Sequence, residues 1–125
     1  MGDLDAPSEG WILVGFNRPG AGLNGARLFF FALDAHGRLR AEEHIADPPG
    51  HAPRATGGCC DQLRVVEARQ RAGRTRTRFL LPRAPARGSD LVLTRGAPTE
   101  LILAYGDSDD FDHHSRHRVH RRLEL

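Results

Sequence analysis

The 125-residue chain contains no lysine, a single methionine at its first position and only two cysteines. Its 18 basic residues are therefore all arginines, and together with 16 acidic residues they leave a formal net charge of only +2 at pH 7. A nucleic-acid-binding protein usually gathers its cations on one face, whereas these arginines alternate with acidic and apolar residues. The composition gives no indication of a nucleic acid partner.

Long apolar segments are also missing. The longest apolar run, around Leu28 to Leu33, is far shorter than the roughly 20 residues that a membrane-spanning helix needs. The first five residues are partly acidic and lack the apolar stretch of a secretory signal peptide, so none is expected in this sequence. No stretch of ten or more residues shows helical periodicity. We expect neither a membrane span nor a mainly helical fold.

The two cysteines, Cys59 and Cys60, are adjacent. Adjacent thiols do not form a zinc framework, and a disulfide between neighbours is strained and rare. The simplest interpretation is a pair of thiols at the start of a strand, with their redox state left open. Cysteine usage therefore does not indicate a compartment.

Short runs rich in β-forming residues alternate with turn residues along the chain. We expect strands at residues 11–16, 26–33, 38–46, 63–69, 74–81, 91–93, 100–105 and 119–125. The segment 34–37 has the composition of a hairpin turn, and the irregular stretch 47–58 is longer than a simple connection requires. The sequence predicts one all-β domain, a meander over residues 10–125, preceded by an N-terminal tail at 1–9.

Arginine and threonine alternate at residues 74–78. Strand side chains alternate between two faces, so Arg74, Arg76 and Arg78 share one face. An anion-binding ladder and a solvated outer face are both compatible with this pattern, and we favour the solvated face.

Histidines concentrate near the C-terminus, at positions 113, 114, 117 and 120, after aspartates at 107, 109, 110 and 112. Imidazole is the commonest metal ligand, and its second nitrogen is usually held by a carboxylate or carbonyl. A divalent cation or haem iron could bind here, although the neighbouring arginines disfavour a cation and a solvated loop explains the spacing equally well. His44 and His51 flank the irregular segment and could approach a ligand from it.

Five motifs in order resemble the DOMON family, the dopamine β-monooxygenase N-terminal-like domains that bind haem or sugars. The motifs span most of the chain and are Gly10-Trp11 with Gly15-Phe16, the segment Gly22 to Ala26, Gly57-Gly58 with Asp61, Gly73 to Phe79, and Ala104-Tyr105-Gly106 followed by Asp109-Asp110-Phe111 and His113-His114. The chain is thus similar to bacterial members of that family.

The resemblance implies an immunoglobulin-like antiparallel β-sandwich that binds b-type haem for electron transfer or haem sensing, without catalysis of its own. It also implies an extracytoplasmic location, periplasmic or secreted, and a redox partner protein. The iron-ligating histidine of the family carries over best to His114 and next to His113. The usual methionine ligand carries over to Leu23.

This sequence departs from the family pattern in two places. Leucine has no lone pair to donate, so Leu23 leaves five-coordinate haem on His114, His/His ligation through His44 or His51, or a pocket without haem. Only nine residues precede Gly10 where the family has two or more strands. We therefore expect either a sequence that is incomplete at its N-terminus, with the export signal also missing, or a sandwich that lacks its first strands and has an open sheet edge, which favours strand addition or a homodimer.

Two other functions fit the same residues. A carbohydrate or another small ligand could stack on Trp11, Tyr105 and Phe111, although a tryptophan at the start of an apolar strand is usually part of the core. A divalent metal could bind Asp109, Asp110, His113 and His114. No nucleophile–base arrangement in the sequence indicates catalysis.

Overall fold

The computed structural model describes residues 2–46, 54–55, 64–80, 96–108 and 117–124. The strands within these ranges are β1 (Gly2–Ala6), β2 (Ile12–Asn17), β3 (Arg27–Leu33), β4 (Leu39–Ile45), β5 (Arg54–Ala55), β6 (Arg64–Arg71), β7 (Arg74–Leu80), β8 (Pro98–Tyr105) and β9 (His117–Glu124). The expected strand at 91–93 and both cysteines lie outside the described residues. No helix in the described part is long and apolar enough to cross a membrane.

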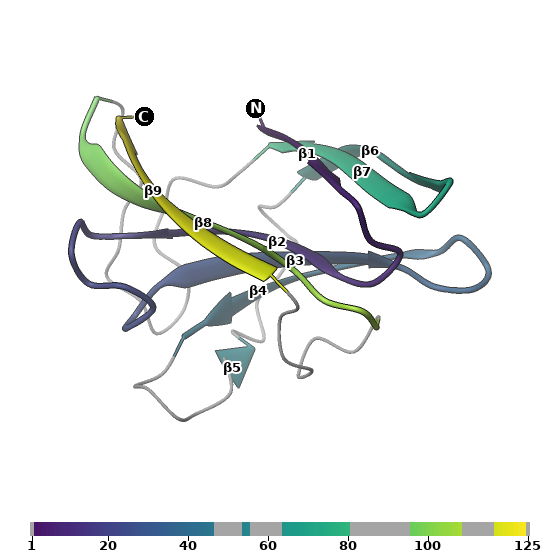
Figure 1. Cartoon of the computed structure of the whole chain (residues 1–125), viewed down its shortest axis with the longest axis horizontal. Coiled ribbons are helices and arrows are strands. Elements are labelled where there is room, and N and C mark those ends of the chain that lie inside the picture. Colours follow the sequence, from purple (N-terminus) through teal and green to yellow (C-terminus); the bar gives the residue numbers. More distant parts are fainter. Residues whose placement is uncertain (1, 47–53, 56–63, 81–95, 109–116, 125) are drawn as a thin grey trace.

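The strands form two antiparallel sheets that pack together as a β-sandwich (Figure 1). One sheet has six strands in the order β5-β4-β3-β2-β8-β9, and the other has three in the order β1-β7-β6. Figure 1 shows the three-stranded sheet lying over one end of the six-stranded sheet. The predicted all-β sandwich is confirmed.

The expected meander is only partly correct. Neighbours in sequence pair from β2 to β5, in the β6–β7 hairpin and from β8 to β9, but β2 also pairs with β8 and β1 pairs with β7. Every residue of β2 and β3 is buried. Strands that are apolar on both faces belong in the middle of a sheet, so β2 takes a distant strand as its second neighbour.

The space between the two sheets is filled by apolar side chains from both. Phe79 of β7 stacks on Phe31 of β3 with ring centroids 5.0 Å apart. The inter-sheet core consists of Ile12, Val14, Phe16, Phe29, Phe31 and Phe79, with Leu4, Ala6, Ala41, Val65, Leu101, Leu103 and Tyr105 packed against it.

The N-terminal segment is a strand and not the expected tail. Residues 2–6 pair with β7 along their whole length. Leu4 and Ala6 pack against the inter-sheet core, while Asp3 and Asp5 alternate to the other face, where carboxylates can meet arginines. Burial on one side and ion pairs on the other explain why so short a segment forms a strand.

The arginines of β7 lie on the solvent face of the three-stranded sheet, and Thr75 and Thr77 face inward. Arg76 binds Asp3 at 2.7 Å, and Arg74 binds Asp5 at 3.0 Å. The hydrogen bond from Arg76 lowers the pKa of Asp3 to about 2. The face is solvated, as expected, and part of its positive charge is matched by carboxylates.

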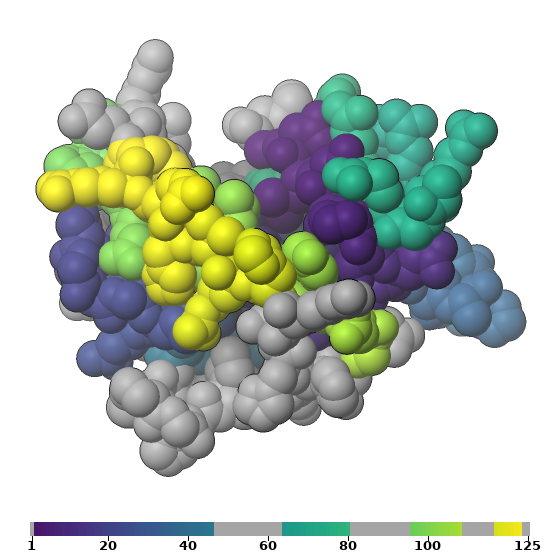
Figure 2. All heavy atoms as spheres, viewed as in Figure 1, coloured from purple at the N-terminus to yellow at the C-terminus, as the bar shows by residue number. Residues whose placement is uncertain are grey.

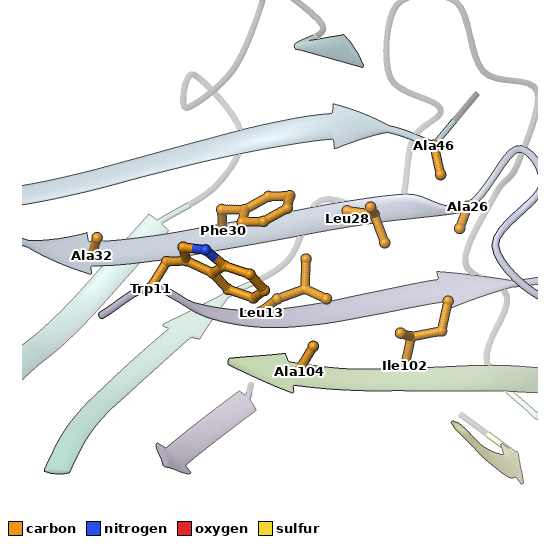
Figure 3. Packing of buried hydrophobic residues seen from close by; sticks show 9 residues of the cluster. All are labelled: Trp11, Leu13, Ala26, Leu28, Phe30, Ala32, Ala46, Ile102 and Ala104. Carbon is orange, nitrogen blue, oxygen red and sulfur yellow. The ribbon is translucent and has the colours of Figure 1, made fainter. Parts of the chain in front are cut away.

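The second face of the six-stranded sheet, turned away from the three-stranded sheet, is also apolar (Figure 3). We call it the outer apolar face. It consists of the buried residues Trp11, Leu13, Ala26, Leu28, Phe30, Ala32, Ala46, Ile102 and Ala104. In a two-layer sandwich the outer side of a sheet is commonly polar, whereas the residues of this face are apolar and buried.

Candidate functional site

The structure describes four of the candidate site residues and leaves the others out. His51, Asp109, Asp110, Phe111, His113 and His114 lie outside the described residues. Trp11, Leu23, His44 and Tyr105 lie within them, and three of the four belong to the side of the six-stranded sheet that carries the outer apolar face.

Trp11 begins the outer apolar face just before β2. Its side chain is 3% exposed and packs edge-on against Phe30, with ring centroids 5.2 Å apart (Figure 3). The indole ring lies against Gly106, where a β-carbon would overlap it. The backbone of Trp11 also bonds to Gly106 and Ser108. The first and last motifs of the sequence therefore meet in space, and the indole Nε1 is buried without an acceptor among the described residues.

Leu23 reaches the same side from the loop between β2 and β3. The amide of Asn17, which is 1% exposed, donates hydrogen bonds to the carbonyls of Gly22 and Asn24 at 2.9 and 2.8 Å. These bonds hold the loop over the end of the sheet, and Leu23 packs against the outer apolar face. The position that resembles the methionine of the DOMON motif is therefore fixed beside this face.

His44 lies on β4 opposite Leu28 and so faces the same side of the sheet. Its ring is 4% exposed and packs on Phe30 with centroids 4.8 Å apart. Its Nε2 lies 3.1 Å from Oε2 of Glu42, and Arg40 binds the same carboxylate oxygen at 3.1 Å. A carboxylate thus orients an imidazole at the edge of an apolar surface.

Tyr105 lies elsewhere. It pairs with Ile12 and packs against the inter-sheet core, and its ring lies 5.7 Å from that of His117. Trp11 and Tyr105 are therefore on opposite sides of the six-stranded sheet. The carbohydrate alternative stays a prediction, with Phe111 outside the described residues.

A second imidazole–carboxylate pair was not among the site residues expected from the sequence. Glu100 of β8 accepts a hydrogen bond from His120 Nδ1 of β9 at 2.8 Å and another from the backbone N–H of Gly20 at 3.1 Å. The hydrogen bond from His120 is the main reason that the pKa of Glu100 is lowered. The histidine cluster signalled His120, but its partner is 20 residues away and only the β8–β9 register reveals it.

This pair borders a surface cleft of about 220 Å³, which we call the Glu100 cleft. It is lined by Pro19, Gly20, Glu100, His120, Arg121 and Arg122. Within the described ranges no three histidine, cysteine, aspartate or glutamate side chains group as metal ligands. The expected metal site at residues 109–114 lies outside these ranges and stays a prediction.

The comparisons with known proteins add no relative. No family model, no curated protein and no solved structure matches the chain. The resemblance to DOMON domains therefore stays a prediction.

Proposed function

We propose that this protein is a non-catalytic ligand-binding module that takes b-type haem, for redox or haem-sensing purposes, against the outer apolar face. The observation that carries the proposal is the position of His44, a buried imidazole held by the Glu42 carboxylate beside an apolar sheet face. An extracytoplasmic location and a redox partner protein belong to the same proposal and follow from the resemblance.

Two features of the described residues support the proposal, an oriented imidazole and a cluster of apolar side chains beside it. A porphyrin requires apolar pocket walls, and Trp11, Phe30 and Leu23 form an apolar cluster on this side of the sheet. A ligating imidazole is usually oriented by a carboxylate on its other nitrogen, and Glu42 contacts the ring of His44. His114 is the iron ligand in this proposal, His44 lies beside the haem, and Leu23 leaves open the coordination position that a methionine would fill.

Haem would supply reversible one-electron chemistry, and the chain would set its potential. Thioether ligation raises the iron potential, so Leu23 in place of methionine implies a lower potential or an open coordination position. The protein would therefore hold the group and shield it from water with apolar side chains.

Titration of the purified protein with hemin tests the proposal. We expect a saturable shift of the Soret band that is lost in His114→Ala, and a change of spin state in His44→Ala if both histidines ligate the iron. His36→Ala, an exposed residue in the hairpin turn, is the matched control. Circular dichroism establishes that each variant is folded.

Leu23→Met tests the proposal through the gain of an iron ligand and not through the loss of haem binding. Leucine-to-methionine exchange nearly conserves volume, so the fold should tolerate it. Haem bound beside Leu23 should acquire a thioether ligand, with a low-spin spectrum and a raised reduction potential, while Leu4→Met in the inter-sheet core should change neither. No Soret shift in the native protein would refute the proposal, and a bound haem indifferent to Leu23→Met would place the haem elsewhere.

A further inference from the structure

The Glu100 cleft lies where the loop after β2 meets the β8–β9 pair. The backbone N–H of Gly20 contacts one oxygen of Glu100, and His120 contacts the other. Arg122 lies directly across the strand pair from Glu100, and the guanidinium of Arg121 donates to the carbonyl of His120 at 3.2 Å. His120 and Arg122 therefore lie on the same face of the strand pair as Glu100, and Arg121, whose side chain alternates to the other face, lines the cleft at the edge of β9.

Both carboxylate oxygens of Glu100 already have hydrogen-bond partners in the cleft. The lowered pKa of Glu100 keeps its side chain ionised at neutral pH. Because an ionised carboxylate only accepts hydrogen bonds, the Nδ1 of His120 carries the proton in this contact. The opposite nitrogen, Nε2, is thereby oriented and has no partner among the described residues.

The cleft arginines differ from those of the three-stranded sheet. Arg74 and Arg76 are each paired with an aspartate. Within the described part of the chain, no carboxylate forms an ion pair with Arg121 or Arg122, and both side chains are exposed. Among the described residues that line the cleft, two guanidinium groups outnumber the single carboxylate of Glu100.

We propose that the Glu100 cleft binds a phosphate group, with Arg122, Arg121 and the second imidazole nitrogen of His120 as its ligands. Guanidinium groups match the geometry of phosphate oxygens with paired N–H donors. A divalent cation is disfavoured, because the described lining offers two ligating side chains, Glu100 and His120, with two guanidinium groups beside them. The cleft is larger than a free phosphate ion, so a phosphomonoester of a small molecule fits it as well as inorganic phosphate.

An NMR titration that follows the His120 ring proton tests the proposal. Inorganic phosphate is added at constant ionic strength, with sodium chloride as the reference salt. We expect a saturable shift of the His120 signal that chloride does not reproduce, with His36 unaffected. Phenyl phosphate in a parallel arm distinguishes the two sources, because tighter binding than inorganic phosphate indicates that the cleft also contacts the organic part.

Matched variants on the same strand separate a site from general positive charge. Arg121→Gln combined with Arg122→Gln should weaken phosphate binding about tenfold or more, as should His120→Gln. Arg118→Gln removes one charge of β9 outside the cleft and should change the affinity less than about twofold. Figure 2 shows the atoms of β9 on the face toward the viewer. The three arginines are exposed and His120 is half-buried, so none of these changes replaces a buried side chain of the core.

Three results would overturn the proposal. These are a His120 signal that does not saturate, a chloride titration that matches the phosphate titration, and equal weakening by Arg118→Gln and the cleft variants. Each of them would mean that phosphate is attracted only by the general positive charge of the surface and that the cleft is not a specific site. Haem binding is measured on different residues, so either proposal can fail without the other.

Discussion

Phe79 is the fully buried residue that the three-stranded sheet contributes to the inter-sheet core. Truncation of its side chain should weaken the packing between the two sheets and lower the free energy of unfolding. The ring is 2% exposed and stacks on Phe31 at 5.0 Å. Truncation of a buried phenylalanine to alanine costs about 3–5 kcal/mol, and an aromatic pair adds about 0.5–1.5 kcal/mol to simple burial. Since domains are stable by only about 5–15 kcal/mol, Phe79→Ala should lose a large part of the total free energy of unfolding.

Urea denaturation followed by circular dichroism measures this loss. Phe79→Leu, which keeps most of the apolar volume, should lose about 1–1.5 kcal/mol. Val66→Ala on β6, where the valine is 55% exposed, should change stability by less than about 0.5 kcal/mol. If Phe79→Ala lost no more than Val66→Ala, the sheets would not be held together by this contact and the packing described above would be wrong.

Three further changes test other parts of the structure. Glu43→Leu removes the carboxylate 2.7 Å from Nε of the fully buried Arg27. We expect the free energy of unfolding, measured in urea, to fall by about 3–5 kcal/mol. A much smaller fall would mean that other groups balance the charge of Arg27. Asn17→Ala should lower the free energy of unfolding by about 1–3 kcal/mol, because two loop carbonyls lose their donor. The backbone amides of residues 22–25 should then exchange faster with solvent. Unchanged exchange would mean that Asn17 does not hold this loop. Since the folded pKa of Glu100 lies below its ordinary 4.5, its stabilisation is present above that pH and is lost as the pH falls through the folded pKa. The urea midpoint of the native protein should therefore fall more steeply between about pH 5 and 3 than that of Glu100→Gln, and parallel curves would contradict the pairing.

The sequence was most informative where a strand carries its own local pattern. Alternation predicted that Arg74, Arg76 and Arg78 share one solvated face, and the structure confirms it, with Thr75, Thr77 and Phe79 buried on the other face. The hairpin turn at residues 34–37 likewise connects β3 to β4 as expected. Side-chain alternation and turn chemistry act within a few residues, so they can be read without knowing the fold.

The parts that could not be predicted depend on contacts between distant segments. The strand at residues 2–6 is too short for its pattern to stand out, and its ion pairs join Asp3 and Asp5 to arginines about 70 residues away. The pairing of β2 with β8 has the same character, because it follows from the burial of both faces of β2. The contact between Glu100 and His120 depends in turn on the β8–β9 register. Spacing in the sequence identified the histidine but could not supply its carboxylate.

The site residues show the same division. The sequence placed His44 and Leu23 near a ligand by resemblance and by their flanking positions, and the structure puts both on the side of the sheet that carries the outer apolar face. Glu42, which orients His44, was not expected, although alternation on β4 puts the two side chains on one face. A search for carboxylates two residues from each strand histidine would have found it.

The two imidazole–carboxylate pairs lie on the same side of the six-stranded sheet but at opposite margins of the outer apolar face. His44 is on β4 and His120 is on β9, and β3, β2 and β8 lie between them. Four strand spacings separate these strands by about 19 Å, which is too far for one small ligand to contact both rings. Haem beside His44 and a phosphate group beside His120 should therefore bind independently, and saturating inorganic phosphate should leave the haem spectrum unchanged. Competition between the two would mean that haem extends across the sheet to the Glu100 cleft, and the arginines there would then bind its carboxylates instead of a separate ligand.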